Sequence, residues 1–140
     1  MMNGKNILIF ICAFVLLLGL DMLWFTTFSL KYIYTPQFKA INGNQPFQFR
    51  IGMGILTWIV LSLSMTILVT TLIHAKRNLI DFFLYGLLTG FVIYFVYNGT
   101  NYSTLKNYKL STVLVDTTWG TILQGFVAFL LGYFFRFQTT

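Results

Sequence analysis

The chain alternates long apolar blocks with short polar connectors. Four blocks are long enough to cross about 30 Å of hydrocarbon as helices that rise about 1.5 Å per residue: Ile7–Phe28, Ile51–Ile73, Leu79–Tyr97 and Leu110–Phe135. The blocks show no alternation of polar and apolar residues, and each is about twice the length of a membrane-barrel strand. The pattern therefore predicts an all-α, integral membrane fold, an antiparallel up-down bundle of four transmembrane helices that forms a single domain over residues 1–140.

The polar segments predict three connectors, at residues 29–50, 74–78 and 98–109. Four spans would place both termini on one side of the membrane. Lys and Arg are divided almost evenly between the two sides, with four on the side of the termini and five on the other. The densest basic cluster, in the tight turn at residues 74–78, favours cytoplasmic termini.

Composition supports a membrane protein and argues against a nucleic-acid-binding one. The chain is 57% hydrophobic and 9% charged, whereas soluble domains carry about 25% charged residues. Its net charge of +6 is spread over every connector, so contact with the lipid bilayer explains it better than a basic patch for nucleic acid. Of the three acids, Asp81 opens the third predicted helix, where the helix dipole favours a negative charge.

The other two acids, Asp21 and Asp116, lie inside apolar blocks. An ionised side chain at depth in a bilayer costs at least ~2.5 kcal/mol, so it is retained where it faces protein or water. In an up-down bundle both acids fall on the same side of the membrane, and a tryptophan follows each acid three residues later, at Trp24 and Trp119. One interpretation is an aromatic belt at the interface with an acid beside it. We favour a second interpretation, in which the two acids share a polar pocket.

Polar residues elsewhere could join this pocket or could simply pack helices together. The end of the third predicted helix falls on the same side as both acids and offers Asn98, Thr100 and Asn101 as hydrogen-bond partners. Further polar side chains recur at helical spacing and suggest a polar track from the pocket to the other surface: Gln124, Ser62, Thr66, Thr70 and His74. The alternative interpretation is that small and hydroxyl residues, including Gly86, Gly90, Gly120 and Gly132, let the helices approach closely. We favour this alternative.

The sequence offers little for catalysis or for a cofactor. One His, one Cys and no Glu do not make a metal cluster or a nucleophile with its base. We therefore expect no metal, no cofactor and no catalytic residue, although a membrane hydrolase that uses the two aspartates stays open as a minor hypothesis.

Three motifs together resemble the family known as domain of unknown function 2177, which consists of small predicted membrane proteins. The motifs are Leu20-Asp21-Met22-Leu23-Trp24, Tyr97-Asn98-Gly99-Thr100-Asn101-Tyr102-Ser103-Thr104-Leu105 and Val115-Asp116-Thr117-Thr118-Trp119-Gly120. The resemblance extends over nearly the whole chain and implies a multi-pass membrane architecture without an assigned activity. The family's usual pattern has an aspartate where this chain has Asn98, so a role that needs three acids is in doubt.

Two functions remain open at this stage. The first is a membrane protein that binds or conducts a small polar solute, a cation or a proton, with Asp21 and Asp116 as its charged groups. The second is a structural subunit of a larger membrane assembly, for example viral or organellar, which would have other membrane subunits as partners and aspartates that hold two helices in register. A pocket that reaches the aspartates would favour the first function, whereas dry and mutually satisfied aspartates would favour the second.

Overall fold

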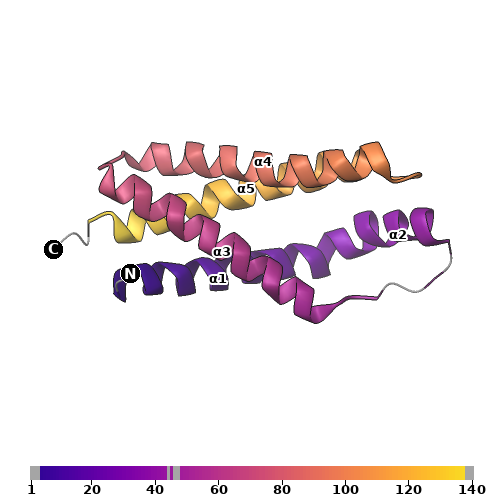
Figure 1. Cartoon of the computed structure of the whole chain (residues 1–140), viewed down its shortest axis with the longest axis horizontal. Helices are drawn as coiled ribbons and strands as arrows, with labels where there is room; N and C mark the ends of the chain where they lie inside the picture. Colours follow the sequence, from indigo (N-terminus) through magenta and orange to yellow (C-terminus); the bar gives the residue numbers. More distant parts are fainter. Residues whose placement is uncertain (1–3, 44, 46–47, 138–140) are drawn as a thin grey trace.

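The computed structural model describes residues 4–43, 45 and 48–137, and every secondary-structure element in this part of the chain is helical (Figure 1). The elements are α1 (Gly4–Trp24), the π-helical segment η1 (Phe25–Tyr34), α2 (Thr35–Asn42), α3 (Ile51–His74), α4 (Leu79–Thr104) and α5 (Leu110–Phe135). Successive long helices run in opposite directions, so the start of α1 and the end of α5 lie at the same end of the bundle (Figure 1).

Four helical segments are long and apolar enough to cross a membrane: Gly4–Asn42, Ile51–His74, Leu79–Thr104 and Leu110–Phe135. Large apolar side chains cover the outside of the bundle, and on α3 alone Ile51, Met53 and Val60 are each more than half exposed. Such a surface is suited to acyl chains rather than to water. The predicted all-α membrane fold with four spanning helices is confirmed.

The first spanning helix is longer than the sequence predicted. The chain does not leave the helix at Phe28 but continues through η1 and α2 to Asn42, so the predicted connector is wrong over residues 29–42. Pro36 suggested a loop there because proline lacks the N–H that an α-helix needs. At the end of η1, immediately before Pro36, the Thr35 N–H donates to the Leu30 carbonyl five residues back. Positions 44, 46 and 47 of the predicted connector lie outside the described residues.

Helix α4 also continues beyond its predicted end at Tyr97. It runs to Thr104, which leaves residues 105–109 as the connector to α5. The polar run that includes Asn98 suggested a turn, but the Asn98 side chain is engaged by groups from outside its own turn, as described below. At the other end, Asp81 is part of a capping box with Asn78, which agrees with the expected acid at this helix start.

Helices α4 and α5 pack closely because glycines line their interface. A Cβ atom at Gly90 would lie 2.4 Å from the Gly120 carbonyl oxygen, and one at Gly86 would lie 2.7 Å from the Gln124 carbonyl oxygen. A Cβ at Gly120 would lie 2.1 Å from the ring of Tyr94. The expectation that small residues allow close helix approach is therefore confirmed for this pair.

The extra length of the first helix caps one end of the bundle. The Gln37 side-chain oxygen on α2 accepts from the Lys109 N–H (2.7 Å) and from the Thr112 hydroxyl (3.0 Å), and its amide nitrogen donates to the Asn107 carbonyl (3.2 Å). In return the Asn107 amide donates to the Ala40 carbonyl over 3.2 Å. Asn107 has a φ of 66°, a left-handed conformation that asparagine tolerates. These bonds fix α2 against the connector between α4 and α5.

Candidate functional site

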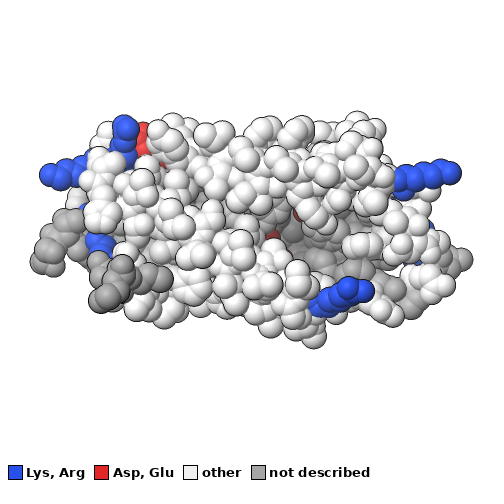
Figure 2. Space-filling view, viewed as in Figure 1, with Lys and Arg blue, Asp and Glu red and all other residues white. Residues whose placement is uncertain are grey.

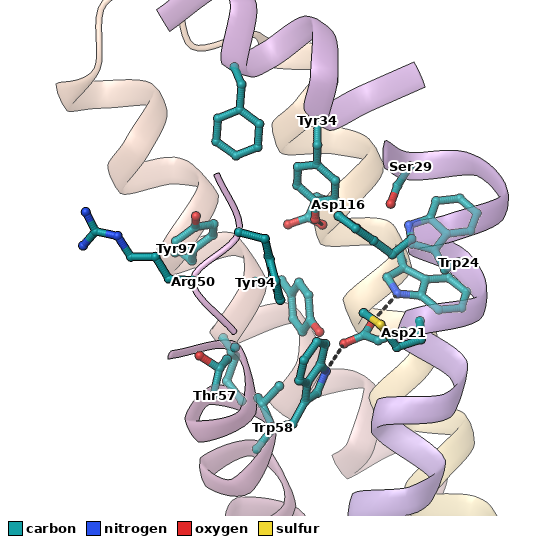
Figure 3. A pocket seen from close by; sticks show the side chains of 18 of the residues that line it. Asp21, Trp24, Ser29, Tyr34, Arg50, Thr57, Trp58, Tyr94, Tyr97 and Asp116 are labelled. Carbon is teal, nitrogen blue, oxygen red and sulfur yellow. Dashed lines mark hydrogen bonds between the residues drawn. The ribbon is translucent and has the colours of Figure 1, made fainter. Parts of the chain in front are cut away.

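A pocket of about 530 Å³ lies in the half of the bundle toward α2, and both Asp21 and Asp116 line it. Side chains from every spanning helix surround it (Figure 3). Figure 2 shows acidic atoms at the base of a hollow in the side of the bundle, with one basic side chain beside the hollow and the other charged side chains of this face toward the two ends. The structure thus brings together the two acids that the sequence pattern singled out.

Two tryptophans hold the Asp21 carboxylate. The Trp119 indole N–H on α5 donates to one oxygen over 2.8 Å, and the Trp58 indole N–H on α3 donates to the other over 2.9 Å. Spacing along one helix suggested that each tryptophan would accompany the acid on its own helix, yet Trp119 crosses to the acid on α1. Sequence reasoning missed Trp58, although it is the one tryptophan of the three that does not follow an acid, and this was the signal that could have identified it.

The Asp116 carboxylate is held by Tyr34 and Asn98. The Tyr34 hydroxyl donates to one oxygen, and the Asn98 amide on α4 donates to the other over 2.7 Å. Asn98 is fully buried, and its amide also donates to the Tyr94 carbonyl over 2.9 Å. Its side-chain oxygen accepts from the Tyr108 hydroxyl over 2.8 Å. Every polar atom of the Asn98 side chain is therefore used, which explains why the helix continues through this position.

Tyr108 lies in the connector at the end of this network. Burial raises the pKa of its hydroxyl to about 12, against the opposing effect of a hydrogen bond with Asn101. The hydroxyl therefore remains a neutral donor to Asn98 across the physiological pH range.

The π-helical segment determines which side chains of the first helix face the pocket. At 3.6 residues per turn, Tyr34 would lie roughly 220° around the helix from Asp21, on the opposite face. A π-helix bonds five residues apart and turns less per residue, which reduces this separation. The pocket-lining residues reflect the change: Asp21, Phe25 and Ser29 follow at intervals of four, Tyr34 comes five residues later, and Phe38 four after that. Sequence reasoning missed Tyr34 because it assigned this segment to a loop.

Two polar atoms of the pocket lining have no hydrogen-bond partner. The Trp24 indole N–H and the Ser29 hydroxyl are both buried and unpaired, and Ser29 is only 1% exposed. Figure 3 shows the two side chains close together on one wall of the pocket. Trp24 is held by stacking on Trp119, with ring centroids 4.6 Å apart and planes 7° from parallel. The indole N–H can only donate and the hydroxyl can donate or accept, so this wall is suited to a ligand that carries an acceptor atom.

The two acids of the pocket have only neutral hydrogen-bond partners. All four donors to the two carboxylates are neutral, and neither acid has an ion-pair partner among the described residues. Arg50, which precedes α3, lines the pocket but is exposed, and Figure 3 shows its guanidinium directed away from the two acids. Its side chain has no hydrogen-bond or ion-pair partner within the described part of the chain.

The remaining residues predicted for the site lie elsewhere. Thr100 is exposed, and neither it nor Asn101 lines the pocket. On α3, the hydroxyls of Ser62, Thr66 and Thr70 each donate to a carbonyl four residues earlier in their own helix, and His74 is exposed at the helix end.

Gln124 is buried on α5 with its amide nitrogen unpaired. Between the pocket and the end with the termini lies a core of apolar side chains that includes Ala13, Met65, Val69 and Val127. The structure therefore does not join the residues of the predicted track through side-chain hydrogen bonds.

Within the described ranges, no group of three or more His, Cys, Asp or Glu side chains is placed to hold a metal ion. The chemistry that the site does offer is two carboxylates with spare acceptor capacity, an aromatic lining and two unpaired donors.

Comparison with known proteins adds the family. The model of a family described as predicted membrane protein, domain of unknown function 2177, matches residues 6–134, which confirms the resemblance carried by the three motifs. No curated protein and no solved structure matches the chain.

Proposed function

The chain belongs to this family of predicted membrane proteins, whose description names no activity. From the pocket itself, we propose that the protein binds a small organic cation. The carboxylates of Asp21 and Asp116 supply the negative charge, and the surrounding aromatic rings supply the walls. The observation that carries the proposal is a pair of carboxylates that share one pocket and are held by neutral donors alone.

The hydrogen-bond inventory leaves room for a cation. An ionised carboxylate offers about four lone-pair sites on its two oxygens, and each oxygen here accepts one bond from the protein. Two charges that share a pocket of low polarity repel each other, whereas a cation between them is attracted to both. A bound ammonium group would therefore supply the positive charge that no described side chain places next to the two acids.

The lining favours an organic cation over a small inorganic one. Nine of the nineteen residues that line the pocket are aromatic, and aromatic faces attract ammonium groups through cation–π interactions. The volume of about 530 Å³ is far above the ~30 Å³ share of a single water and lies in the range of small-molecule sites.

Binding accounts for the interior better than conduction does. The hydroxyl groups along α3 donate to their own helix backbone, and apolar side chains fill the bundle between the pocket and the far end. A conducted ion would have to pass this dry segment, which is costly in a medium without water. A purely structural subunit, in turn, does not require a cavity beside its two acids.

Tryptophan fluorescence provides a direct test, because all three tryptophans of the chain line the pocket. We would titrate the purified full chain in a neutral detergent with choline chloride and with 3,3-dimethyl-1-butanol, the uncharged analogue of choline. The expected result is a saturable change in emission for choline alone. Asp21→Asn and Asp116→Asn should each weaken binding by about tenfold or more.

Asp81→Asn is the matched control, because it removes the third acid of the chain at the far end of α4. It should bind choline like the wild type. An equal response to both probes, or wild-type affinity in both pocket variants, would refute the proposal.

A further inference from the structure

We infer that the cation in this pocket belongs to a membrane phospholipid with a zwitterionic headgroup, which enters sideways from the bilayer between α3 and α4. This inference rests on the proposed function, since it names the molecule that carries the ammonium group. Three observations support it: the direction in which the pocket opens, the order of charges from its base to its mouth, and the two unpaired donors in its wall.

The pocket opens on the side of the bundle. Figure 2 views the molecule across its helices, and the acidic atoms are visible at the base of the hollow. Figure 1 shows why: α3 crosses the bundle obliquely, so that its first half lies away from α4. The first half of α3 lines one side through Trp58 and Leu61, and α4 lines the other through Ile93 and Tyr97. In a membrane this opening faces lipid, so a lipid can enter without first passing through water.

The charges are arranged in the order of a zwitterionic headgroup. The two carboxylates lie at the base of the pocket, and Arg50 is the exposed cation of its lining. A headgroup of this class carries an ammonium at its tip and a phosphate a few atoms nearer the glycerol. With the ammonium between the acids, the phosphate lies toward the mouth, where a guanidinium is a suitable partner. The Arg50 side chain is free to make this bond, since no described residue engages it.

The unpaired donors point to a ligand with oxygen acceptors. A bare ammonium ion, which has no acceptor atom, would leave the Trp24 indole N–H without a partner, and the buried Ser29 hydroxyl could only accept from it. Phosphate and ester oxygens accept hydrogen bonds, so a phospholipid would satisfy the same wall that a simple cation leaves unsatisfied. An anionic phospholipid without an ammonium group, such as phosphatidylglycerol, has the acceptors but lacks the positive charge, and it would face two carboxylates.

Native mass spectrometry tests the inference on the full chain in detergent. The protein is incubated with equal amounts of phosphatidylethanolamine, phosphatidylcholine and phosphatidylglycerol that carry the same acyl chains. We expect one zwitterionic lipid to be retained in preference to phosphatidylglycerol, and this preference should disappear in the Asp21→Asn/Asp116→Asn double variant. Glycerophosphocholine, which has the headgroup without acyl chains, should compete only weakly.

Arg50→Gln separates the lipid from the cation site. It should reduce retention of the zwitterionic lipid by roughly tenfold, equivalent to about 1.4 kcal/mol, whereas choline binding should not weaken, because removing a cation from the lining leaves the attraction of the two carboxylates for the ammonium intact. Lys106→Gln is the matched control, because Lys106 is an exposed cation of the connector after α4 that does not line the pocket. It should leave both measurements unchanged, and Arg50→Lys should restore part of the lipid retention.

The outcomes distinguish the two proposals. Equal retention of all three lipids, or glycerophosphocholine binding as tight as that of the lipid, overturns the phospholipid while choline binding still supports the cation site. If choline does not bind, and if lipid retention is the same in the wild type and in the Asp21→Asn/Asp116→Asn double variant, both proposals are overturned.

Discussion

The glycine contact between α4 and α5 yields a prediction in which two identical substitutions on one helix should have opposite effects. Gly90→Ala places a Cβ 2.4 Å from the Gly120 carbonyl oxygen and 2.9 Å from the Thr121 Cα. Gly99→Ala, nine residues later on α4, places a Cβ no closer than 3.8 Å to the ring of Phe95, an ordinary contact. Each substitution adds the same methyl group and the same helix propensity, so the difference between them isolates the packing of the two helices.

The expected size follows from these distances. Replacing glycine by alanine within a helix favours folding by about 1 kcal/mol, and at Gly99 nothing opposes this gain. At Gly90 an ordinary carbon–oxygen contact needs at least ~3.3 Å, so the helices must separate locally by about 1 Å, and overpacking of this kind costs roughly 1–3 kcal/mol. We therefore expect Gly90→Ala to be less stable than Gly99→Ala by about 1–3 kcal/mol.

The local separation of α4 and α5 should also disturb the pocket. Asn98 lies about two turns from Gly90 and donates a hydrogen bond to Asp116 across the same interface. Unfolding of both variants by sodium dodecyl sulfate in mixed micelles, followed by circular dichroism, gives their free energies of unfolding. Tryptophan emission of the folded proteins reports the pocket and should shift in Gly90→Ala alone. Equal stabilities within about 0.5 kcal/mol, with unchanged emission in both variants, would show that the close approach of α4 and α5 is not as described.

Three further predictions concern hydrogen bonds around the pocket. Trp58→Phe removes one of the two donors to the Asp21 carboxylate and should lower the free energy of unfolding by about 0.6–1.7 kcal/mol. Trp24→Phe removes an unpaired N–H and should lower it by less, measured by the same unfolding in sodium dodecyl sulfate. Asn98→Asp sets two carboxylates about 2.7 Å apart, a repulsion of roughly 6 kcal/mol at an effective dielectric constant of about 20, so the pair should keep one proton at neutral pH. Infrared spectra should then show a new protonated carboxyl band, and its absence would count against the contact with Asp116. Gln37→Leu should release α2 from the connector after α4 and speed amide hydrogen exchange at residues 105–109; unchanged exchange would argue against this clamp.

The sequence predicts the parts of this molecule that depend on composition along one helix. Long apolar blocks identify the four spans, because a spanning helix satisfies its backbone groups internally and needs only an apolar exterior. The cost of a charge in hydrocarbon singles out Asp21 and Asp116, and the pocket contains both. These inferences do not require any knowledge of how the helices are rotated.

The contacts that the sequence could not predict depend on how each helix is rotated about its own axis. Trp58 and Tyr34 reach the acids only because α3 and η1 present particular faces to the pocket. The direction of Tyr34 depends on a π-helical segment, for which the chain gives no clear signal besides Pro36. Polarity suggested a loop for residues 29–42 and for the end of α4, but side chains such as Gln37 and Asn98 find partners on other helices. Tertiary hydrogen bonds have overridden the local signals there.

Ser29 offers a way to separate a binding pocket from a structural one, because the two interpretations predict different combinations of stability and affinity. Its hydroxyl is 1% exposed and has no partner, and a buried unpaired polar group costs about 1–3 kcal/mol. Ser29→Ala should therefore raise the free energy of unfolding of the ligand-free protein by about 1 kcal/mol or more, measured by unfolding in sodium dodecyl sulfate. If the hydroxyl serves a phospholipid, the same variant should retain phosphatidylcholine less well. The matched control is Ser62→Ala, since the Ser62 hydroxyl is equally buried but donates to the Trp58 carbonyl over 2.6 Å; it should lose a little stability and keep the lipid. A gain in stability with unchanged lipid retention in Ser29→Ala would mean that the unpaired hydroxyl does not serve the ligand.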